Sequence, residues 1–239
     1  KVERCALSAV DLPRLPRLEE LSLDFNPIAR LTLPELPALT RFSIHLHQLT
    51  DLPAVLSALP LTALHAAYGP LETLPALPES LTSLSVGNTR LTALPESLAG
   101  CRSLEMLHAS DNAFERLPAV DFPELVSVFL SSCGLSEVPA LVLRAPKLWV
   151  LRMAGNPQLT ALPDAITALP IRLLDLNRTG LTAIPPQVQA MPRLETLELQ
   201  GAPLQRWPDW PPPPALRSLR ISNTPLKEQP PPPAWAHLA

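Results

Sequence analysis

Residues 104–118 read LEMLHASDNAFERLP, and the spacing within this stretch determines how the rest of the chain is interpreted. With Leu104 taken as position 0, apolar residues stand at positions 3, 5 and 10, an asparagine at position 8 and a Leu-Pro pair at positions 13 and 14. Alternate residues of an extended segment point to the same side, so positions 3 and 5 predict a short strand with one buried face. The stretch therefore predicts a strand, a turn at the asparagine and a return segment.

The same spacing recurs along the whole sequence. Ten copies begin at Leu18, Leu39, Leu61, Leu81, Leu104, Leu125, Leu148, Ile171, Leu194 and Leu216, at intervals of 20 to 23 residues. This period and pattern define a leucine-rich repeat. An eleventh, partial copy is expected from Val2, with Cys5 and Leu7 at positions 3 and 5. The sequence thus predicts an α/β solenoid of about ten to eleven leucine-rich repeats, with a concave parallel β-sheet and short, irregular helical, 3₁₀ or extended convex segments.

The repeats predict a single domain over residues 1–239, because they leave no room for a second independent core. Residues 1–17 are expected to form a partial N-terminal repeat or cap, residues 18–228 the ten repeats, and residues 229–239 a C-terminal cap or tail. An open solenoid end exposes core, so Trp235 and Leu238 are expected to lie over the last coil. Because the first residue is a lysine, we expect the chain to be a piece of a longer polypeptide.

Composition and charge narrow the classes of function. Most of the 32 prolines are phased with the repeat, so they do not indicate disorder. A formal charge of −3 and the lack of a Lys/Arg run argue against nucleic acid as a partner. No apolar run approaches the roughly 18 residues of a membrane span. Cys5, Cys101 and Cys133 are expected to be reduced and scattered, with Cys5 at a core position.

Position 8 is expected to turn inward, where an asparagine amide can satisfy backbone groups of neighbouring coils. It is asparagine at Asn26, Asn112 and Asn156, and threonine, cysteine, histidine, glycine or alanine in the other copies. The ladder is therefore incomplete, and individual coils should differ in stability. Losing one buried amide of this kind typically costs about 1 to 3 kcal/mol.

Return segments differ in length, so they should differ in structure. The 20-residue copy from Leu61 is short and rich in proline, and it should return in extended form. The segments after Leu94 and Leu162 are longer and have room for one helical or 3₁₀ turn that starts at a proline.

Outward residues at positions 2 and 4 describe the surface of the sheet. They are mostly small and polar in the first half, where the partial copy would contribute Arg4 and Ala6, and they turn apolar, aromatic and charged from Met106 onward. Phe129 is the most informative, because a phenylalanine on the solvent side of a sheet lowers solubility. Aromatic residues and arginine dominate binding hot spots. The predicted partner-binding residues are Met106, His108, Phe129, Trp149, Val150, Arg152, Leu173, Asp175 and Arg178.

Two other interpretations of this surface stay open. The side chains could simply cover one another, or the register could slip by one residue around Val128. The charges of Arg152, Asp175, Glu198 and Arg220 are equally consistent with a cross-strand charge ladder. With the binding interpretation, we expect a protein partner on the concave face of a monomeric chain.

No catalytic or metal-ligating set stands out. His45 and His65 should point outward while His47 points inward, and no carboxylate or cysteine completes a ligand set. The seven glycines form no phosphate-binding loop, and no Ser/His/Asp or Cys/His arrangement rises above chance. The sequence therefore predicts no cofactor, no metal and no enzymatic activity in these residues.

Segments such as LETLPALPESLTSLSVGNTRLTALPESL and LTAIPPQVQAMPRLETLELQGAPL resemble the leucine-rich regions of type III secreted effectors from Gram-negative plant and animal pathogens. The resemblance covers nearly the whole chain. In that family the leucine-rich region recognises host proteins and commonly precedes a ubiquitin ligase domain, which can act through a Cys-x-Asp motif. Here Cys5, Cys101 and Cys133 are followed by Ala-Leu, Arg-Ser and Gly-Leu. The resemblance thus implies that any ligase activity lies outside these residues.

The leading functional hypothesis is a non-catalytic protein-recognition domain that forms the host-target or substrate-binding region of a secreted bacterial effector. From the resemblance, such a protein would be delivered by a bacterium into the host cell cytosol. Two alternatives remain: the recognition domain of a ubiquitin ligase effector whose catalytic domain lies outside this chain, and an intracellular scaffold protein.

Overall fold

The computed structural model describes residues 1–238 and contains two compact units, Lys1–Leu125 and Val126–Ala239. Each unit is a stack of leucine-rich coils. This confirms the predicted leucine-rich repeat solenoid, with short parallel strands and short 3₁₀ or helical return segments.

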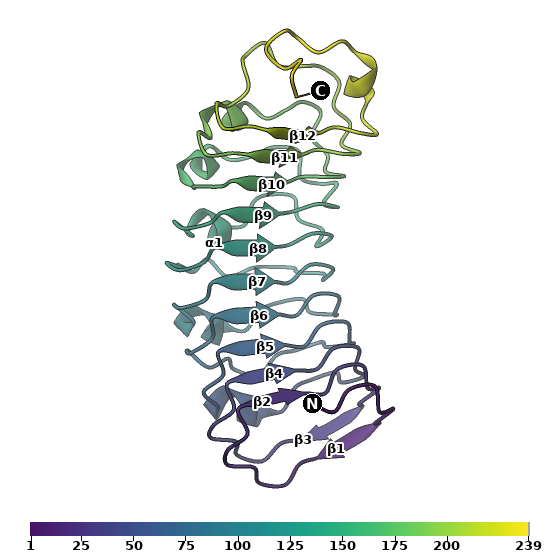
Figure 1. The fold of residues 1–239 in the computed structure, drawn as a ribbon, viewed down its shortest axis with the longest axis vertical. Coiled ribbons are helices and arrows are strands. Elements are labelled where there is room, and N and C mark those ends of the chain that lie inside the picture. The colour runs from purple at the N-terminus through teal and green to yellow at the C-terminus, as the bar shows by residue number, and fades with distance from the viewer. Residues whose placement is uncertain (239) are drawn as a thin grey trace. The chain divides into compact units, whose positions relative to one another are not determined.

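Five strands of the first unit form a parallel sheet (Figure 1). In order, they are β2 (Glu20–Ser22), β4 (Arg41–Ser43), β5 (Ala63–His65), β6 (Ser83–Ser85) and β7 (Met106–His108). Each covers positions 2 to 4 of one copy, and its middle residue pairs with the middle residue of the next strand, as Leu84 does with Leu107. Because the middle side chain is buried and the flanking ones face outward, every coil adds one leucine or phenylalanine to the core.

The second unit repeats this arrangement with β8 (Ser127–Phe129), β9 (Val150–Arg152), β10 (Leu173–Asp175), β11 (Thr196–Glu198) and β12 (Ser218–Arg220). Consecutive strands pair in parallel with no offset, as Leu174 does with Leu151 and Leu197. Val128 and Leu151 are completely buried, and so are Leu130 and Met153 at position 5. The predicted inner rows are therefore confirmed.

Return segments follow the predicted dependence on length. Short helical turns are η1 (Ala54–Ala58), η2 (Glu96–Gly100), α1 (Ala140–Leu143), η3 (Asp164–Ala168), η4 (Pro186–Ala190) and η5 (Pro225–Glu228). A proline at the N-cap or first helical position starts all six, since its missing N–H needs no partner there. Between β5 and β6 the return segment contains no helical turn, as its short length predicts.

The inward asparagines at position 8 tie their coils to the preceding ones. The Asn112 side-chain oxygen accepts hydrogen bonds from Leu91 N (3.0 Å) and from the Thr89 hydroxyl (2.5 Å). Its amide nitrogen donates to Val86 O (2.9 Å) and Ala109 O (3.1 Å). Asn156 and Asn26 make equivalent bonds, which confirms the predicted amide ladder.

Position 7, one residue earlier, adopts the left-handed conformation in every one of the ten full copies. The residues are Phe25, Leu46, Tyr68, Asn88, Asp111, Ser132, Gly155, Arg178, Gly201 and Asn223, with φ between 53° and 71°. This turn of the backbone sends the next side chain inward, and the position-7 N–H donates to the position-6 carbonyl of the following coil, as Phe25 N does to His45 O (2.9 Å). The spacing of the leucines alone does not predict this row.

The first, partial copy has a different frame from the one expected. Val2 N donates to Ser22 O (2.9 Å) in the way that Leu23 N donates to Ser43 O, so Val2 takes position 5 and not position 0. Cys5 consequently takes position 8, is exposed, and donates its N–H to Asn26 Oδ1 (2.8 Å). The prediction that Cys5 is a core residue, and that Arg4 and Ala6 belong to the strand rows, is wrong because this coil adds no strand to the sheet of β2 to β7.

The first and the last coils of the chain each have an additional local structure. At the front, β1 (Ala9–Asp11) pairs with β3 (Arg30–Thr32) in a separate two-stranded parallel sheet. At the other end, Trp235 is completely buried, lies 5.3 Å from the Trp210 ring, and donates Nε1–H to Trp210 O (2.7 Å). Trp235 therefore serves as the predicted cap, and Leu238 beside it is half-buried.

Candidate protein-binding surfaces

The open face of the second unit is the side that carries positions 2 and 4 of β8 to β12, and it holds most of the predicted partner-binding residues. Its position-4 row is Phe129, Arg152, Asp175, Glu198 and Arg220. The Arg152 guanidinium carbon lies 5.9 Å from the centre of the Phe129 ring, and Arg152 Nη1 lies 3.9 Å from Asp175 Oδ2. Arg220 Nη1 lies 3.1 Å from Glu198 Oε1. An aromatic ring is thus followed by charges in the order plus, minus, minus, plus.

The two carboxylates in the middle of the row are poorly solvated. Asp175 is only 5% exposed and Glu198 8% exposed. Burial raises the pKa of Asp175, and the neighbouring Glu198 raises it further, while the Asn177 N–H bond and the two arginines act in the opposite direction. Each carboxylate therefore has an arginine on its outer side, as in the expected cross-strand charge ladder.

Phe129, Val150 and Leu173 face outward beside Val128, Leu151 and Leu174, which are fully buried. The alternative in which the register slips around Val128 is therefore excluded. All three outward side chains are half-buried, so they cover one another in part and leave a partly exposed apolar strip next to Arg152. The Arg152 Nε atom is itself buried and has no hydrogen-bond partner within residues 1–238.

Trp149 and Arg178 lie at opposite ends of the strands. Trp149 immediately precedes β9, is 47% exposed, and has the Arg172 guanidinium carbon 4.8 Å from its ring centre. Arg172 also lies 3.4 Å from Glu195 Oε1. Arg178 follows β10 at position 7. The structure therefore does not bring these two predicted site residues together across the sheet.

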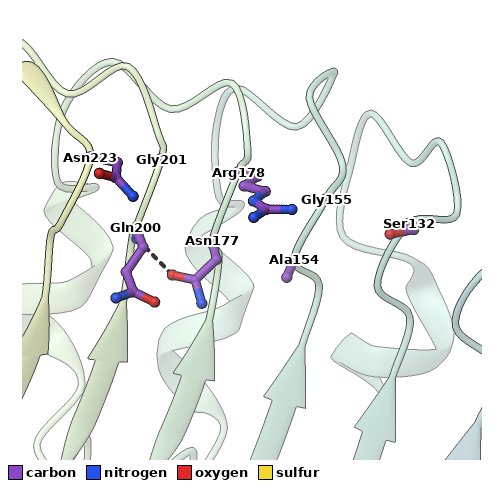
Figure 2. A pocket seen from close by; sticks show the side chains of 8 residues that line it. All are labelled: Ser132, Ala154, Gly155, Asn177, Arg178, Gln200, Gly201 and Asn223. Atoms are coloured by element: carbon purple, nitrogen blue, oxygen red, sulfur yellow. Dashed lines mark hydrogen bonds between the residues drawn. The ribbon is translucent and has the colours of Figure 1, made fainter.

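Arg178 lines a separate hollow of about 500 Å³ at the carboxyl ends of the strands. Its lining residues are Ser132, Ala154, Gly155, Asn177, Arg178, Gln200, Gly201 and Asn223. Figure 2 shows the Arg178 side chain extending from its own coil toward Gly155. The neighbouring coils have Gly155 and Gly201 at position 7, without side chains. Asn177 Oδ1 accepts the Gln200 N–H (2.6 Å), so much of the polar lining is already engaged within the second unit.

Met106 and His108 lie on β7, in the first unit. Both are half-buried and outward-facing. The His108 Nδ1 atom lies 3.4 Å from the Ser85 hydroxyl, and burial lowers the pKa of His108. The predicted site residues are therefore divided between the two units, with these two in the first and the other seven in the second.

The histidines are arranged as the sequence predicts. His45 and His65 face outward with ring centres 6.2 Å apart, and His47 is 1% exposed inside the coil. Burial lowers the pKa of His47 to about 4, so its ring is neutral at neutral pH. Among the described residues, no group of three or more His, Cys, Asp or Glu side chains is placed to hold a metal ion.

Sequence reasoning missed one surface entirely. Phe25, Leu46 and Tyr68 occupy position 7 of three consecutive coils in the first unit and are 44%, 48% and 53% exposed. The one available signal was the recurrence of bulky apolar residues at position 7 of three consecutive copies. Only the left-handed backbone at this position shows that these side chains project from the turn and do not enter the core.

Sequence comparisons find relatives of part of the chain. No model of a known protein family matches it. The human PH domain leucine-rich repeat-containing protein phosphatase 1 is 36% identical over 104 residues, which are 41% of this chain and 6% of that protein. The human geranylgeranyl transferase type-2 subunit alpha is 38% identical over 99 residues, 39% of this chain and 18% of that protein. The chain thus spans a small fraction of the curated relatives that it matches.

Structural comparisons match almost the whole chain. A leucine-rich repeat protein of Leptospira interrogans has a TM-score of 0.77 at 22% identity and covers 93% of this chain and 71% of its own. YopM from Yersinia enterocolitica has a TM-score of 0.72 at 27% identity, covering 91% and 49%, and Yersinia pestis YopM is described as a leucine-rich effector protein. The complex PEPR1–AtPEP1 has a TM-score of 0.68 at 26% identity, covering 90% and 34%. These likenesses establish the leucine-rich repeat domain.

Leucine-rich solenoids generally bind proteins through extended faces. The candidate sites of this fold are therefore surfaces. Separately, no helix among the described residues is both long and apolar enough to cross a membrane.

Proposed function

We propose that the chain is a non-catalytic protein-recognition domain that binds its partner through the open face of the second unit. The observation that carries the proposal is Phe129, which faces outward from β8 with the Arg152 guanidinium carbon over its ring, 5.9 Å from the ring centre. An aromatic ring next to an arginine, with Val150 and Leu173 alongside, has the composition of a binding hot spot.

The unsatisfied Arg152 Nε atom supports the same surface. A buried N–H without a partner costs about 1 to 3 kcal/mol, and a carbonyl or carboxylate of a bound protein would satisfy it. Asp175 already engages the Nη1 end of the same guanidinium at 3.9 Å, so the arginine is held in place for a second acceptor. A partner surface with an apolar group and an adjacent acceptor fits this arrangement.

We propose the absence of catalysis from the burial, the pKa and the sequence context of the cysteine thiols. Burial raises the pKa of Cys101 to about 11, and nearby Glu79 raises it further, so this thiol is not a nucleophile at neutral pH. Cys133 is buried, and Cys5 is followed by Ala-Leu and so lacks the Cys-x-Asp pattern of effector ligases. Residues 1–239 should therefore form no ubiquitin conjugates in a reconstituted ligation reaction, and conjugate formation would overturn this part of the proposal.

Binding is tested with Phe129→Ala and Trp149→Ala, and Arg193→Ala on an exposed return segment serves as the matched control. Partners captured from host-cell lysate by wild type would be identified, and their affinities measured by calorimetry. We expect at least tenfold weaker binding for Phe129→Ala, a smaller loss for Trp149→Ala, and no change for the control. A large fall in melting temperature would show that the side chains belong to the core and would contradict the proposal.

We further propose that the recognised protein belongs to a host cell and that the parent protein is a secreted bacterial effector. The support is the resemblance of the repeats to effector repeats and the 27% identity with YopM over 91% of this chain. A translocation reporter fused to the parent protein should enter host cells from a bacterium with an intact type III system, and not from a system-deficient strain. Equal entry from both strains would contradict delivery by the type III system, and no entry from either would favour the intracellular scaffold.

A further inference from the structure

We propose that Phe25, Leu46 and Tyr68, which we call the apolar row, form a docking site for an extended peptide segment of a partner protein. The segment would carry apolar side chains with an acidic residue beside them. This site lies in the first unit and shares no residue with the open face of the second unit. It is therefore a second interaction surface, and it does not depend on the function proposed above.

The apolar row is continuous and exposed. Phe25 N donates to His45 O, and Leu46 N donates to Ala67 O, so the three residues sit at the same point of three hydrogen-bonded coils. Neighbouring coils are about 4.8 Å apart, which places Phe25 and Tyr68 roughly 10 Å from each other. The side chains are 44% to 53% exposed. Three large apolar groups in a line of this length match a few residues of an extended chain.

The backbone at these three positions argues against a purely structural role. Each residue has φ near 60°, a conformation that is unfavourable for bulky side chains. The second unit shows that the fold does not require bulk there, because it has Gly155, Gly201 and Asn223 at the same position. Strained residues of this kind cluster at binding sites, where the strain is retained for function.

The histidine rings beside the apolar row provide polar groups for a peptide backbone. The His45 ring meets the Tyr68 ring edge-on at 6.4 Å and stacks on His65 at 6.2 Å. His45 Nδ1 accepts the Ala67 N–H at 3.3 Å, which places the proton of the neutral ring on Nε2. The Nε2–H belongs to a ring that contacts Tyr68 of the row, so it is a donor that a peptide carbonyl bound there would satisfy.

Two arginines near the apolar row determine which charge the bound peptide should carry. The Arg4 guanidinium carbon lies 4.7 Å above the Phe25 ring, and Arg90 lines a hollow of about 350 Å³ together with Tyr68. Neither arginine has an ion pair within residues 1–238. Asp24, which precedes Phe25 in the sequence, is already engaged by the Ser43 hydroxyl (2.6 Å) and by His45 N (2.7 Å). An acidic residue of the peptide would therefore complement Arg4 or Arg90.

The test uses a displayed library of random nine-residue linear peptides, selected on the full chain. The comparison protein is the triple variant Phe25→Gly, Leu46→Gly, Tyr68→Gly. Glycine relieves the left-handed strain, so the variant should fold with a melting temperature equal to or above that of wild type. We expect enriched peptides with two or more large apolar residues and an adjacent Asp or Glu. Their affinity should fall at least tenfold on the triple variant and on Tyr68→Asn, and should be unchanged on Phe129→Ala.

Several outcomes would overturn the proposal. They are equal enrichment on wild type and the triple variant, peptides that lose affinity with Phe129→Ala instead, and enriched peptides that are basic. Binding of the wild type but not the triple variant to vesicles of phosphatidylcholine and phosphatidylserine, without peptide enrichment, would assign the row to a lipid surface and not to a protein. The affinity of the peptides for Phe129→Ala distinguishes failure of this proposal from failure of the open-face proposal.

Discussion

The inward asparagines are the clearest case in which a single residue stabilises a coil. Asn112 is 6% exposed and uses both ends of its amide on the backbone of its own coil and the preceding one. The backbone N–H and C=O groups that bind this amide have no access to water, so removing the amide leaves several of them unpaired.

We predict that Asn112→Ala lowers the free energy of unfolding by about 1 to 3 kcal/mol. Urea denaturation of the chain measures this directly. Gln48→Ala is the control, because Gln48 is exposed and makes no side-chain hydrogen bond with the described residues. Equal stabilities for the two variants would show that the amide ladder adds nothing.

His47 fills the same position in a different way. Its Nδ1 atom accepts the Leu49 N–H (3.0 Å), and its buried Nε2 atom has no partner within the described residues. The next coil has Gly69 at position 8, and a β-carbon there would lie 2.3 Å from His47 Cε1. The ring therefore occupies the space that a side chain of residue 69 would need, so the two residues depend on each other.

We predict a pH dependence of stability that originates at His47. Its pKa is about 4 in the folded chain against 6.5 ordinarily, so the unfolded chain binds more protons between these values. The stabilising contribution is complete above about pH 6.5 and is lost as the pH falls toward about 4, by about 1 to 3 kcal/mol. Thermal unfolding of wild type and His47→Asn between these limits measures the difference.

The control for this prediction uses the packing of His47 against Gly69. Gly69→Ala should destabilise the chain at neutral pH, and His47→Ala in the same molecule should recover part of the loss because the ring no longer occupies that space. A wild-type pH profile that matches that of His47→Asn would rule out His47 as the source.

At the scale of elements, the strands are only three residues long, so each depends on its neighbours. A strand of this length contributes one fully buried side chain, such as Leu107 of β7, between two outward ones. Such elements are stable only as part of a stack, since most of their contacts come from adjacent coils.

We predict that Leu107→Asp unfolds the coils around β7, because a buried charge without a partner costs about 3 kcal/mol or more. Hydrogen exchange should lose protection in β6 and β7 together. The matched variant Met106→Asp in the same strand places its carboxylate on the outward side and should retain protection. Equal protection in the two variants would mean that the alternation of the strand is reversed.

Across the molecule, the two ends of the chain are closed by different means. The first coil adds no strand to the sheet of β2 to β7 and leaves Val2 42% exposed. At the other end, Trp235 lies against Trp210 and Trp207, with ring centres 5.3 and 6.0 Å away, and is completely buried. A capped end should resist fraying more than an uncapped one.

We predict that Trp235→Ala destabilises the last coils by about 3 to 5 kcal/mol, because it removes a large buried ring. Hydrogen exchange should increase in β12 and η5 and stay unchanged in β8 and β9. Trp235→Phe keeps most of the packing and loses the bond to Trp210 O, so it should have a smaller effect. Uniform loss of protection throughout the second unit would contradict a local cap.

The repeat period alone determined much of this protein. The strands at positions 2 to 4, the buried leucines and the inward asparagines all follow from local spacing, because every coil must bury the same positions against its neighbours. The outward orientation of Phe129, Val150, Arg152, Leu173 and Asp175 follows from the same alternation. These features could be predicted since they depend on residues close together in the sequence.

Only the tertiary structure decided which side chains of different coils meet. It placed Trp149 and Arg178 at opposite strand ends, matched His47 to Gly69, gave the first coil its true frame and exposed Phe25, Leu46 and Tyr68 as one row. The left-handed turn at position 7 favours glycine or asparagine, so large residues there give no local sign of their conformation. Such pairings join residues about one full coil apart, and the physical reason lies in packing between coils and not in the pattern within one.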